Sequence, residues 1–396
     1  MRDLSPGKAG LWPTGLLTPA PSCISDDRIE EIQYKEPKRT GAAARQCDKK
    51  LGEKRMTAQL HEPDNLVEFL DGSVVKYPDR PLFGTKNAQG VYEWISYAQV
   101  GRRVDNLRAG LAGLGVGRGD AVGIIANNRV EWAVGAFASF GLGARWMPMY
   151  EAELAQVWQY IIQDSSIKIL FVSKPEIYEE VRGMVDTLPA LEKIFLIESD
   201  GANSMAGLEK AGEQNPVPSI RPDSDDIAAL IYTSGTTGDP KGVLLSHGNF
   251  TSNTLAGRKM YPELETTIGV SLSILPWAHS YGQTAELYSI IYLGGSIGFM
   301  EDVTTLASDM AQVKPTWLIA VPRVFNKIYD GLWSKMNETG GLPKKLFVMG
   351  VESAKKRREL AQRGKSEFIT NLKFRIADRS CFRRYAINWG DASWVP

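Results

Sequence analysis

The residues best suited to chemistry in this 396-residue chain lie in one short polar segment, YTSGTTGDPKG, at residues 232–242. Its glycines permit positive φ and let the main chain approach a ligand closely. Its hydroxyls can donate hydrogen bonds beside backbone N–H groups, and its lysine adds a mobile positive charge. Together these groups predict a cradle for an oxyanion, and for phosphate in particular. The candidate ligands are Thr233, Ser234, Gly235, Thr236, Thr237, Gly238 and Lys241.

The same segment also fits a plain Gly/Ser/Thr hairpin turn, which accounts for the glycines but not for the hydroxyls and the lysine. It is not a Walker P-loop, because that motif requires Gly-Lys-Ser/Thr and here Lys241 precedes glycine. The apolar DIAALI (226–231) predicts a buried strand before the segment. After it, GVLLSHGNF predicts a short strand and then a helix capped by Ser246 or Asn249.

The composition limits the function classes to which the chain can belong. Basic and acidic residues are balanced at 46 each, which gives no support for general binding to nucleic acid. The cysteines are far apart and predict neither a disulfide framework nor a metal site, as in a reducing, intracellular compartment. Three histidines are too few for a histidine-rich metal centre. These residues are Cys23, Cys47, Cys381, His61, His247 and His279.

The remaining sequence predicts an α/β fold. Residues 1–58 are rich in Pro, Gly, Lys and Arg without periodicity, so we expect a disordered leader. Beyond it, amphipathic helices such as residues 96–115 alternate with short apolar strands such as AVGIIAN (121–127). This alternation predicts a largely parallel sheet covered by helices. The longest apolar stretches, 133–144 and 287–300, are too short to span a bilayer and are interpreted as buried segments.

The alternation resumes after the polar segment. TWLIAVP (316–322) is predicted as one of its short apolar elements. RVFNKIYDGLWSKM (323–336) and PKKLFVMGVESAKKRREL (343–360) are predicted as helices, as is EIYEEVRGMVDTL (176–188) earlier in the chain.

Several of these segments resemble a known family. YTSGTTGDPKGVLLSHGN (232–249) resembles the signature loop of the adenylate-forming, or AMP-binding, enzymes, which include acyl-CoA synthetases, firefly luciferase and peptide-synthetase adenylation domains. LPWAHSYGQTAEL (275–287) resembles their histidine-containing segment, and AVPRVFNKIYDGL (320–332) resembles the long-chain fatty acyl-CoA synthetase branch. The resemblance spans residues 59–379 and implies the large N-terminal domain of that fold, with stacked, helix-covered, mostly parallel sheets.

The resemblance implies a two-step ligase reaction with ATP, Mg²⁺ and coenzyme A. A fatty acid carboxylate attacks the α-phosphate of ATP to give acyl-adenylate and pyrophosphate, and the coenzyme A thiol then displaces AMP. The loop from Ser234 to Gly238, with Thr236 in a catalytic role, would hold the β- and γ-phosphates. Lys241 would neutralise the leaving pyrophosphate, and Thr233 would help orient Mg²⁺. The fatty acid and coenzyme A are the implied partners, and the implied location is intracellular, either cytoplasmic or in peripheral contact with an organelle membrane.

The resemblance also assigns the histidines. By itself His279 fits a hydrogen-bonded residue at a helix end, but the family histidine lies beside the acyl carbonyl and the α-phosphate. Tyr281 and Gly282 would then lie on the wall of the acyl pocket. We expect His247 to be structural, and Trp277 fits pocket lining and plain core equally well.

The end of the chain departs from the family. Residues 380–396 match none of its segments, and the expected Mg²⁺-binding glutamate, ribose-binding aspartate and adenylation lysine are not found in this sequence. We therefore expect a C-terminally truncated copy with impaired activity. Codons for residues 380–393 can be chosen so that a one-base shift reads IVFSKVRHKLGGRL, which resembles the family's continuation, so a frameshifted tail is a hypothesis.

Two alternatives to a fatty acyl-CoA ligase remain open from the sequence. One is a relative that activates aryl or amino acids, which the segment VPRVFNKIYD (321–330) disfavours. The other is a non-catalytic remnant that binds an acyl chain or a nucleotide.

Overall fold

The computed structural model describes residues 62–233, 240–261, 268–302 and 305–379. All of them belong to one compact unit that begins at Glu62. The predicted leader (1–58) and the predicted aberrant tail (380–396) lie outside the described residues.

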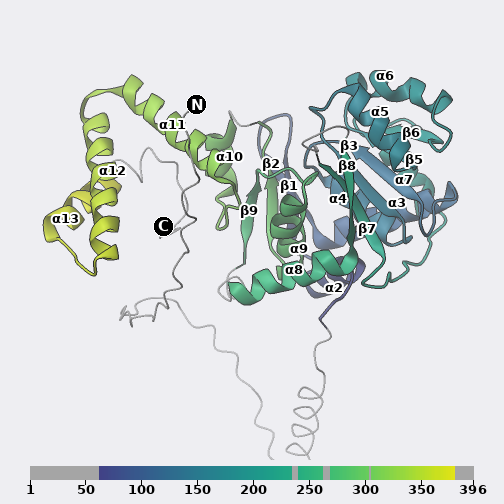
Figure 1. Cartoon of the computed structure of the whole chain (residues 1–396), viewed down its shortest axis with the longest axis horizontal. Coiled ribbons are helices and arrows are strands. Elements are labelled where there is room, and N and C mark those ends of the chain that lie inside the picture. Colours follow the sequence, from purple (N-terminus) through teal and green to yellow (C-terminus); the bar gives the residue numbers. More distant parts are fainter. Residues whose placement is uncertain (1–61, 234–239, 262–267, 303–304, 380–396) are drawn as a thin grey trace, which may run out of the picture. The chain divides into compact units, whose positions relative to one another are not determined.

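The larger sheet has six strands among the described residues, and every neighbouring pair is parallel except β7 and β8 (Figure 1). The helices between consecutive parallel strands confirm the predicted β–α alternation and the α/β fold. In spatial order the strands are β6 (Lys193–Leu196), β5 (Ile167–Val172), β3 (Ala121–Ile125), β4 (Arg145–Met149), β7 (Ile227–Thr233) and β8 (Lys241–Ser246).

The smaller sheet has four strands in the described part of the chain, and it was only partly predicted. Its first two strands form an antiparallel hairpin that the sequence did not indicate, because short segments with glycine and charged residues lack a clear period. Gly84 is required there, since a Cβ atom would lie 2.8 Å from the indole of Trp94. The spatial order is β2 (Tyr92–Ser96), β1 (Pro81–Lys86), β10 (Ser296–Phe299) and β9 (Val270–Ser273).

The central strand β3 is buried on both faces, as parallel strands between helix layers usually are. Val122 and Ile124 belong to one core cluster, whereas Ala121 and Ile125 belong to another on the opposite face. The first cluster continues into the smaller sheet, so both sheets share it. Trp277 lies in this cluster with none of its surface exposed, which decides its assignment in favour of core.

The helices begin where the sequence provides a side-chain cap. Ser96 and Ser246 each form a capping box, so of the two predicted caps Ser246 is correct and Asn249 is its reciprocal partner. The helices of this region are α2 (Leu66–Lys76), α3 (Tyr97–Gly113), α4 (Val130–Phe140), α5 (Ala155–Asp164), α6 (Pro175–Val181), η1 (Arg182–Asp186), α7 (Met205–Glu213), α8 (His247–Met260), η3 (Gly282–Tyr288), α9 (Ser289–Leu293) and α10 (Leu306–Val313).

Two predicted elements differ from the structure. The helix expected over 176–188 becomes α6 followed by the tighter 3-10 turn η1. The segment 316–322 forms one isolated bridge, Trp317 to Ser271, in place of a regular element. The backbone N–H groups of Thr316 and Trp317 both donate to the Val270 carbonyl oxygen, so a regular ladder does not continue from there.

Of the last three described helices, the first two were predicted and the third was not, and they pack mainly on one another. Met336 and Phe347 form the buried centre of this group. One face of the final helix is apolar and open to solvent, with Phe368 80% and Ile369 60% exposed. No helix in the described ranges is long and apolar enough to cross a membrane. These helices are α11 (Pro322–Thr339), α12 (Gly341–Gln362) and α13 (Phe368–Ala377).

The backbones of helices α3 and α7 lie in close contact, so a substitution at this contact can test the fold. A Cβ atom at Gly212 would lie 1.9 Å from the Asn106 carbonyl oxygen, whereas nothing lies within 4 Å of one at Gly113. Gly212→Ala should therefore lower the free energy of unfolding by about 1–3 kcal/mol, because two backbones must separate. Gly113→Ala is the control and should be neutral or slightly stabilising. Urea denaturation distinguishes the two, and equal stability of both variants would contradict this packing.

Candidate functional site

The predicted phosphate-binding segment connects the two strands of an antiparallel hairpin. Thr233 ends β7 and Lys241 begins β8, and the two residues are direct cross-strand partners. Both side chains are exposed at the edge of the larger sheet. The predicted strand–loop–strand–helix unit is therefore confirmed. The remaining predicted ligands, Ser234, Gly235, Thr236, Thr237 and Gly238, lie outside the described residues.

The loop after β9 presents the predicted catalytic histidine to solvent. His279 is exposed, and its Nδ1 accepts a hydrogen bond of 3.1 Å from the backbone N–H of Tyr281. Because Nδ1 acts as an acceptor, the neutral ring carries its proton on Nε2. The ring thus has one donor available for a ligand.

Gly282 has a steric role at the same loop. A Cβ atom there would lie 2.3 Å from the Pro276 carbonyl oxygen, so only glycine lets the following helix begin this close to the loop. That helix, η3, is a π-helix, a form that is rare and often found at functional sites. Gly282 is buried and Tyr281 is exposed.

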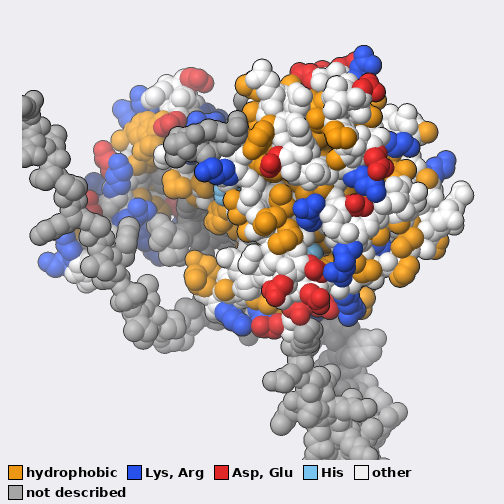
Figure 2. Space-filling model, turned by 45° about the vertical axis from the view of Figure 1, so that its right-hand side comes forward, with side chains coloured by type: hydrophobic (Ala, Val, Ile, Leu, Met, Phe, Trp, Pro, Cys, Tyr) orange, Lys and Arg blue, Asp and Glu red, His pale blue; other side chains and the backbone are white. Residues whose placement is uncertain are grey.

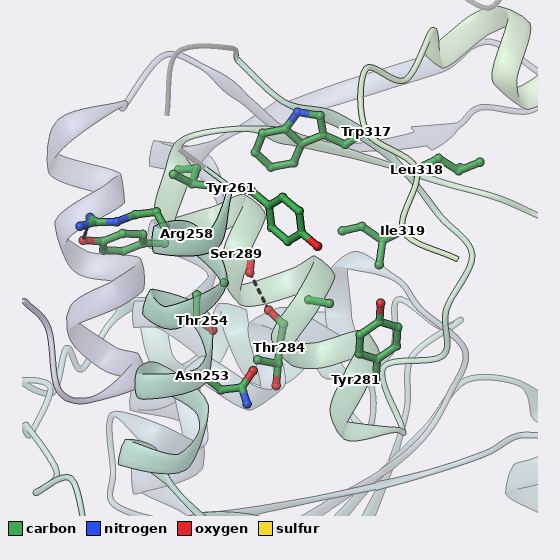
Figure 3. A pocket seen from close by; sticks show the side chains of 14 residues that line it. Asn253, Thr254, Arg258, Tyr261, Tyr281, Thr284, Ser289, Trp317, Leu318 and Ile319 are labelled. Atoms are coloured by element: carbon green, nitrogen blue, oxygen red, sulfur yellow. Dashed lines mark hydrogen bonds between the residues drawn. The ribbon is translucent and has the colours of Figure 1, made fainter. Parts of the chain in front are cut away.

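A cavity of about 540 Å³ lies between helices α8, η3 and α9 and the extended segment 317–319 (Figure 3). Its volume is within the range of small-molecule binding sites. Tyr281 connects it to the histidine loop, because its N–H binds His279 and its side chain lines the cavity. The other lining residues are Asn253, Thr254, Gly257, Arg258, Tyr261, Thr284, Ala285, Ser289, Tyr292, Leu293, Trp317, Leu318 and Ile319.

Most of this lining was missed by the sequence reasoning. On α8 and its C-cap the lining residues follow helical spacing, at 253, 254, 257, 258 and 261. That spacing was a usable signal, but the residues are small, polar or charged and do not form an apolar stripe. Ser289 donates to the Thr284 carbonyl oxygen at 2.7 Å, and the Arg258 guanidinium donates to the Tyr292 hydroxyl at 3.0 Å (Figure 3).

His247 is structural, as predicted. It is buried at the start of α8, where its Nδ1 accepts a hydrogen bond of 3.3 Å from the backbone N–H of Leu66. The ring packs edge-on against Phe140. Burial lowers the pKa of His247 to about 4, so the ring is neutral at physiological pH. His61 lies outside the described residues.

A buried carboxyl group beside the histidine loop was not predicted. Glu286, on η3, is fully buried, and burial raises its pKa to about 7. Its oxygens accept hydrogen bonds of 2.9 Å from Ser271 Oγ, 2.7 Å from Ser273 Oγ and 2.9 Å from Trp277 Nε1. A single glutamate in a helical segment gave no sequence signal, because glutamates usually face solvent.

The described residues contain no group of three or more His, Cys, Asp or Glu side chains that could hold a metal ion. The predicted Mg²⁺ contact, Thr233, offers one exposed hydroxyl. Mg²⁺ in nucleotide sites usually has few protein ligands and is bound mainly by phosphate oxygens and water. One hydroxyl beside the predicted phosphate-binding segment fits that pattern.

Figure 2 shows acidic and basic side chains interspersed over the face that it presents.

The family model of AMP-binding enzymes matches residues 70–373. The chain belongs to the AMP-binding enzyme family. The predicted resemblance is therefore confirmed, and relatives named fatty acyl-CoA synthetase and long-chain-fatty-acid–CoA ligase match as well.

Three relatives illustrate the extent of the likeness. The chain is 34% identical to fatty acyl-CoA synthetase A of Dictyostelium discoideum, over 67% of this chain and 41% of that protein. It is 30% identical to long-chain-fatty-acid–CoA ligase FadD15 of Mycobacterium tuberculosis, over 82% of this chain and 54% of that protein. The crystal structure of the long-chain-fatty-acid–CoA ligase FadD1 of Archaeoglobus fulgidus is 21% identical with a TM-score of 0.61, over 69% of this chain and 55% of that chain, which shows the fold. The chain thus spans about half the length of the relatives that it matches.

The two buried titratable groups predict opposite effects of pH on stability. Glu286 has a raised pKa, so the folded chain binds more protons than the unfolded chain between about pH 4.5 and 7, and stability decreases as pH rises through that range. His247 has a lowered pKa, so stability decreases as pH falls from about 6.5 to 4.

Glu286→Gln removes the first effect and leaves the second. The stability of this variant relative to the wild type should increase by up to about 3 kcal/mol between pH 5 and pH 8, at about 1.4 kcal/mol per pKa unit. Urea denaturation at both pH values measures the difference. A difference that does not change with pH would contradict the raised pKa of Glu286.

Proposed function

We propose that this chain carries the nucleotide- and acyl-binding region of a fatty acyl-CoA ligase. The enzyme would join a fatty acid to coenzyme A through an acyl-adenylate, with release of pyrophosphate and then AMP. Family membership and the names of the relatives support this reaction class. Because the chain spans about half of those relatives, the activity of the whole protein and its substrates are part of the proposal.

One observation carries the acyl part of the proposal. Tyr281 donates its backbone N–H to His279 and places its side chain in the lining of the 540 Å³ cavity. A carboxylate at His279 and an acyl chain in the cavity could therefore belong to one molecule. The interior of the cavity would remove the chain from water, at roughly 0.8 kcal/mol per buried methylene.

In the first step the enzyme must hold a polyanion and a weak nucleophile in line, since phosphoryl chemistry is catalysed mainly by position and charge. Lys241 would bind the leaving pyrophosphate, and the segment 234–238 would bind the β- and γ-phosphates. The Nε2–H of His279 would donate to an oxygen of the carboxylate or of the α-phosphate as negative charge develops there. Mg²⁺, when bound, supplies charge neutralisation at the phosphates, and Thr233 would be one of its ligands.

In the second step the coenzyme A thiol must reach the acyl carbonyl and displace AMP.

We also propose that the chain divides into a leader at 1–58, the family domain at 59–379 and an aberrant tail at 380–396, and that its activity is impaired. An intracellular location, cytoplasmic or peripheral on an organelle membrane, is likewise proposed.

Two other functions are separated by simple assays. An aryl- or amino-acid-activating relative would bind such acids in preference to fatty acids, in a screen by ligand-induced thermal shift. A non-catalytic remnant would bind acyl chain or nucleotide without the coupling between the two sites that a ligase needs.

The hairpin is tested by removal of its charge. Lys241→Ala should weaken the binding of pyrophosphate at least about tenfold, or about 1.4 kcal/mol, because a direct charge–charge contact is lost. Lys210→Ala on α7 is the matched control and should bind as the wild type does. Isothermal titration calorimetry measures both. Equal affinity of the two variants for pyrophosphate would instead favour the interpretation of this segment as a plain hairpin turn.

The cavity is tested by filling it. Ala285 is one of its lining residues, and Ala285→Phe should weaken the binding of a fluorescent long-chain fatty acid at least about tenfold, because the ring occupies the space of the chain. Ala206→Phe, at an exposed position on α7, is the control. Unchanged binding by a folded Ala285→Phe variant would place the acyl chain elsewhere.

A further inference from the structure

Glu286 is a fully buried carboxyl group to which the proposed reaction gives no task. A buried, hydrogen-bonded acid often contributes no more stability than an apolar side chain of similar size. Its presence in the core is therefore best explained by what it does for its hydrogen-bond partners.

Its partners lie on two different elements. Ser271 and Ser273 belong to β9, whereas Trp277 belongs to the loop that carries the histidine. Indole Nε1–H can only donate, so it needs an acceptor when buried, and Trp277 is fully buried. Glu286 Oε2 accepts from both Trp277 and Ser273 and so joins the loop to the strand.

The loop is held from its other side by Asn128, which follows β3 of the larger sheet. The Asn128 side-chain oxygen accepts from the backbone N–H of Trp277 at 2.7 Å, and its Nδ2 donates to the Leu275 carbonyl oxygen at 2.7 Å. Nδ2 also lies 2.8 Å from Ser273 Oγ, the same hydroxyl that donates to Glu286. The network is therefore continuous from the larger sheet to η3.

A second contact from η3 completes the fixation. Gln283 Nε2 donates to the Trp277 carbonyl oxygen at 2.8 Å, and Gln283 Oε1 accepts from the Tyr288 hydroxyl at 2.9 Å. The N–H, the carbonyl oxygen and the indole N–H of Trp277 thus all have partners outside the loop. His279 is two residues further along the chain.

We propose that Glu286 is a positioning residue: its carboxylate oxygens fix Trp277 against β9 and thereby set the place and the tautomer of His279. The inference rests on the proposed role of His279 in acyl-adenylate formation. Glu286 itself touches no substrate, because it is sealed from solvent behind the loop.

The test compares two substitutions at one site. Glu286→Gln keeps an oxygen for Trp277 and Ser273, and its amide can donate to the Ser271 hydroxyl, so it should preserve the network. Glu286→Leu removes both acceptors. Amide hydrogen exchange should then accelerate at least about tenfold in residues 275–283 of the Leu variant, with exchange in strand β3 unchanged. Trp277→Phe, which removes the loop's indole donor together with part of a ring packed on Phe83, Trp132 and Phe299, should also give local acceleration and serves if the Leu variant does not fold.

A spectroscopic measurement separates positioning from general stability. With three histidines in the chain, selective nitrogen-15 labelling gives few imidazole signals. At pH 8 the wild type and the Gln variant should show His279 held with its proton on Nε2, whereas the Leu variant should show an average of the two tautomers. The proposal would be overturned if the Leu and Phe variants kept a single Nε2–H tautomer of His279 and exchanged their amide hydrogens in residues 275–283 at the wild-type rate. It would also be overturned if amide exchange accelerated equally in β3 and in residues 275–283.

These measurements use no ligand, so their failure counts against Glu286 alone. The proposed function stands or falls with the pyrophosphate and fatty acid measurements above. If the affinities for pyrophosphate and fatty acid did not depend on Lys241 and Ala285, the ligase proposal would fail. The local effect of Glu286 could still be measured.

Discussion

The arrangement of the site depends on the fixation of one loop, residues 274–281, between two sheets. Asn128, which follows β3 of the larger sheet, binds the loop. Glu286 on η3 also binds the loop and connects it to β9. Gly282 lets the π-helix begin against the Pro276 carbonyl oxygen, where any side chain would collide. These contacts hold a surface histidine in place through buried partners, which is how a rigid scaffold presents a reactive group on a loop.

The same loop joins two functions that the sequence suggests separately. The hairpin of β7 and β8, for which phosphate binding is proposed, extends the edge of the larger sheet, whereas the cavity lies between α8, η3 and α9. Tyr281 belongs both to the loop and to the cavity lining. An adenylate-forming enzyme needs such a junction, because the acid and the nucleotide react at one point although most of each is bound elsewhere.

The parts of the fold and of the site that could be predicted are those marked by short-range patterns in the sequence. The alternation of apolar strands and amphipathic helices predicted the larger sheet, and Ser246 was a recognisable helix cap because its hydroxyl and the Asn249 amide form a reciprocal pair. The β1–β2 hairpin was missed because its strands are short and only partly buried. Glu286 and the cavity lining were missed for a different reason. A buried carboxylate is recognisable only from its donors, and Ser271, Ser273 and Trp277 reach it through tertiary packing that no local spacing encodes.

The central claim is that the histidine loop and the cavity form one site for one acyl-adenylate. Calorimetric titration with a hydrolysis-resistant palmitoyl-adenylate analogue, a palmitoyl sulfamoyl adenosine, tests it most directly. If the two features are joined, the analogue should bind at least about a hundredfold more tightly than either AMP or palmitate alone, because one molecule combines both sets of contacts. An affinity equal to that of the tighter single component would contradict the claim.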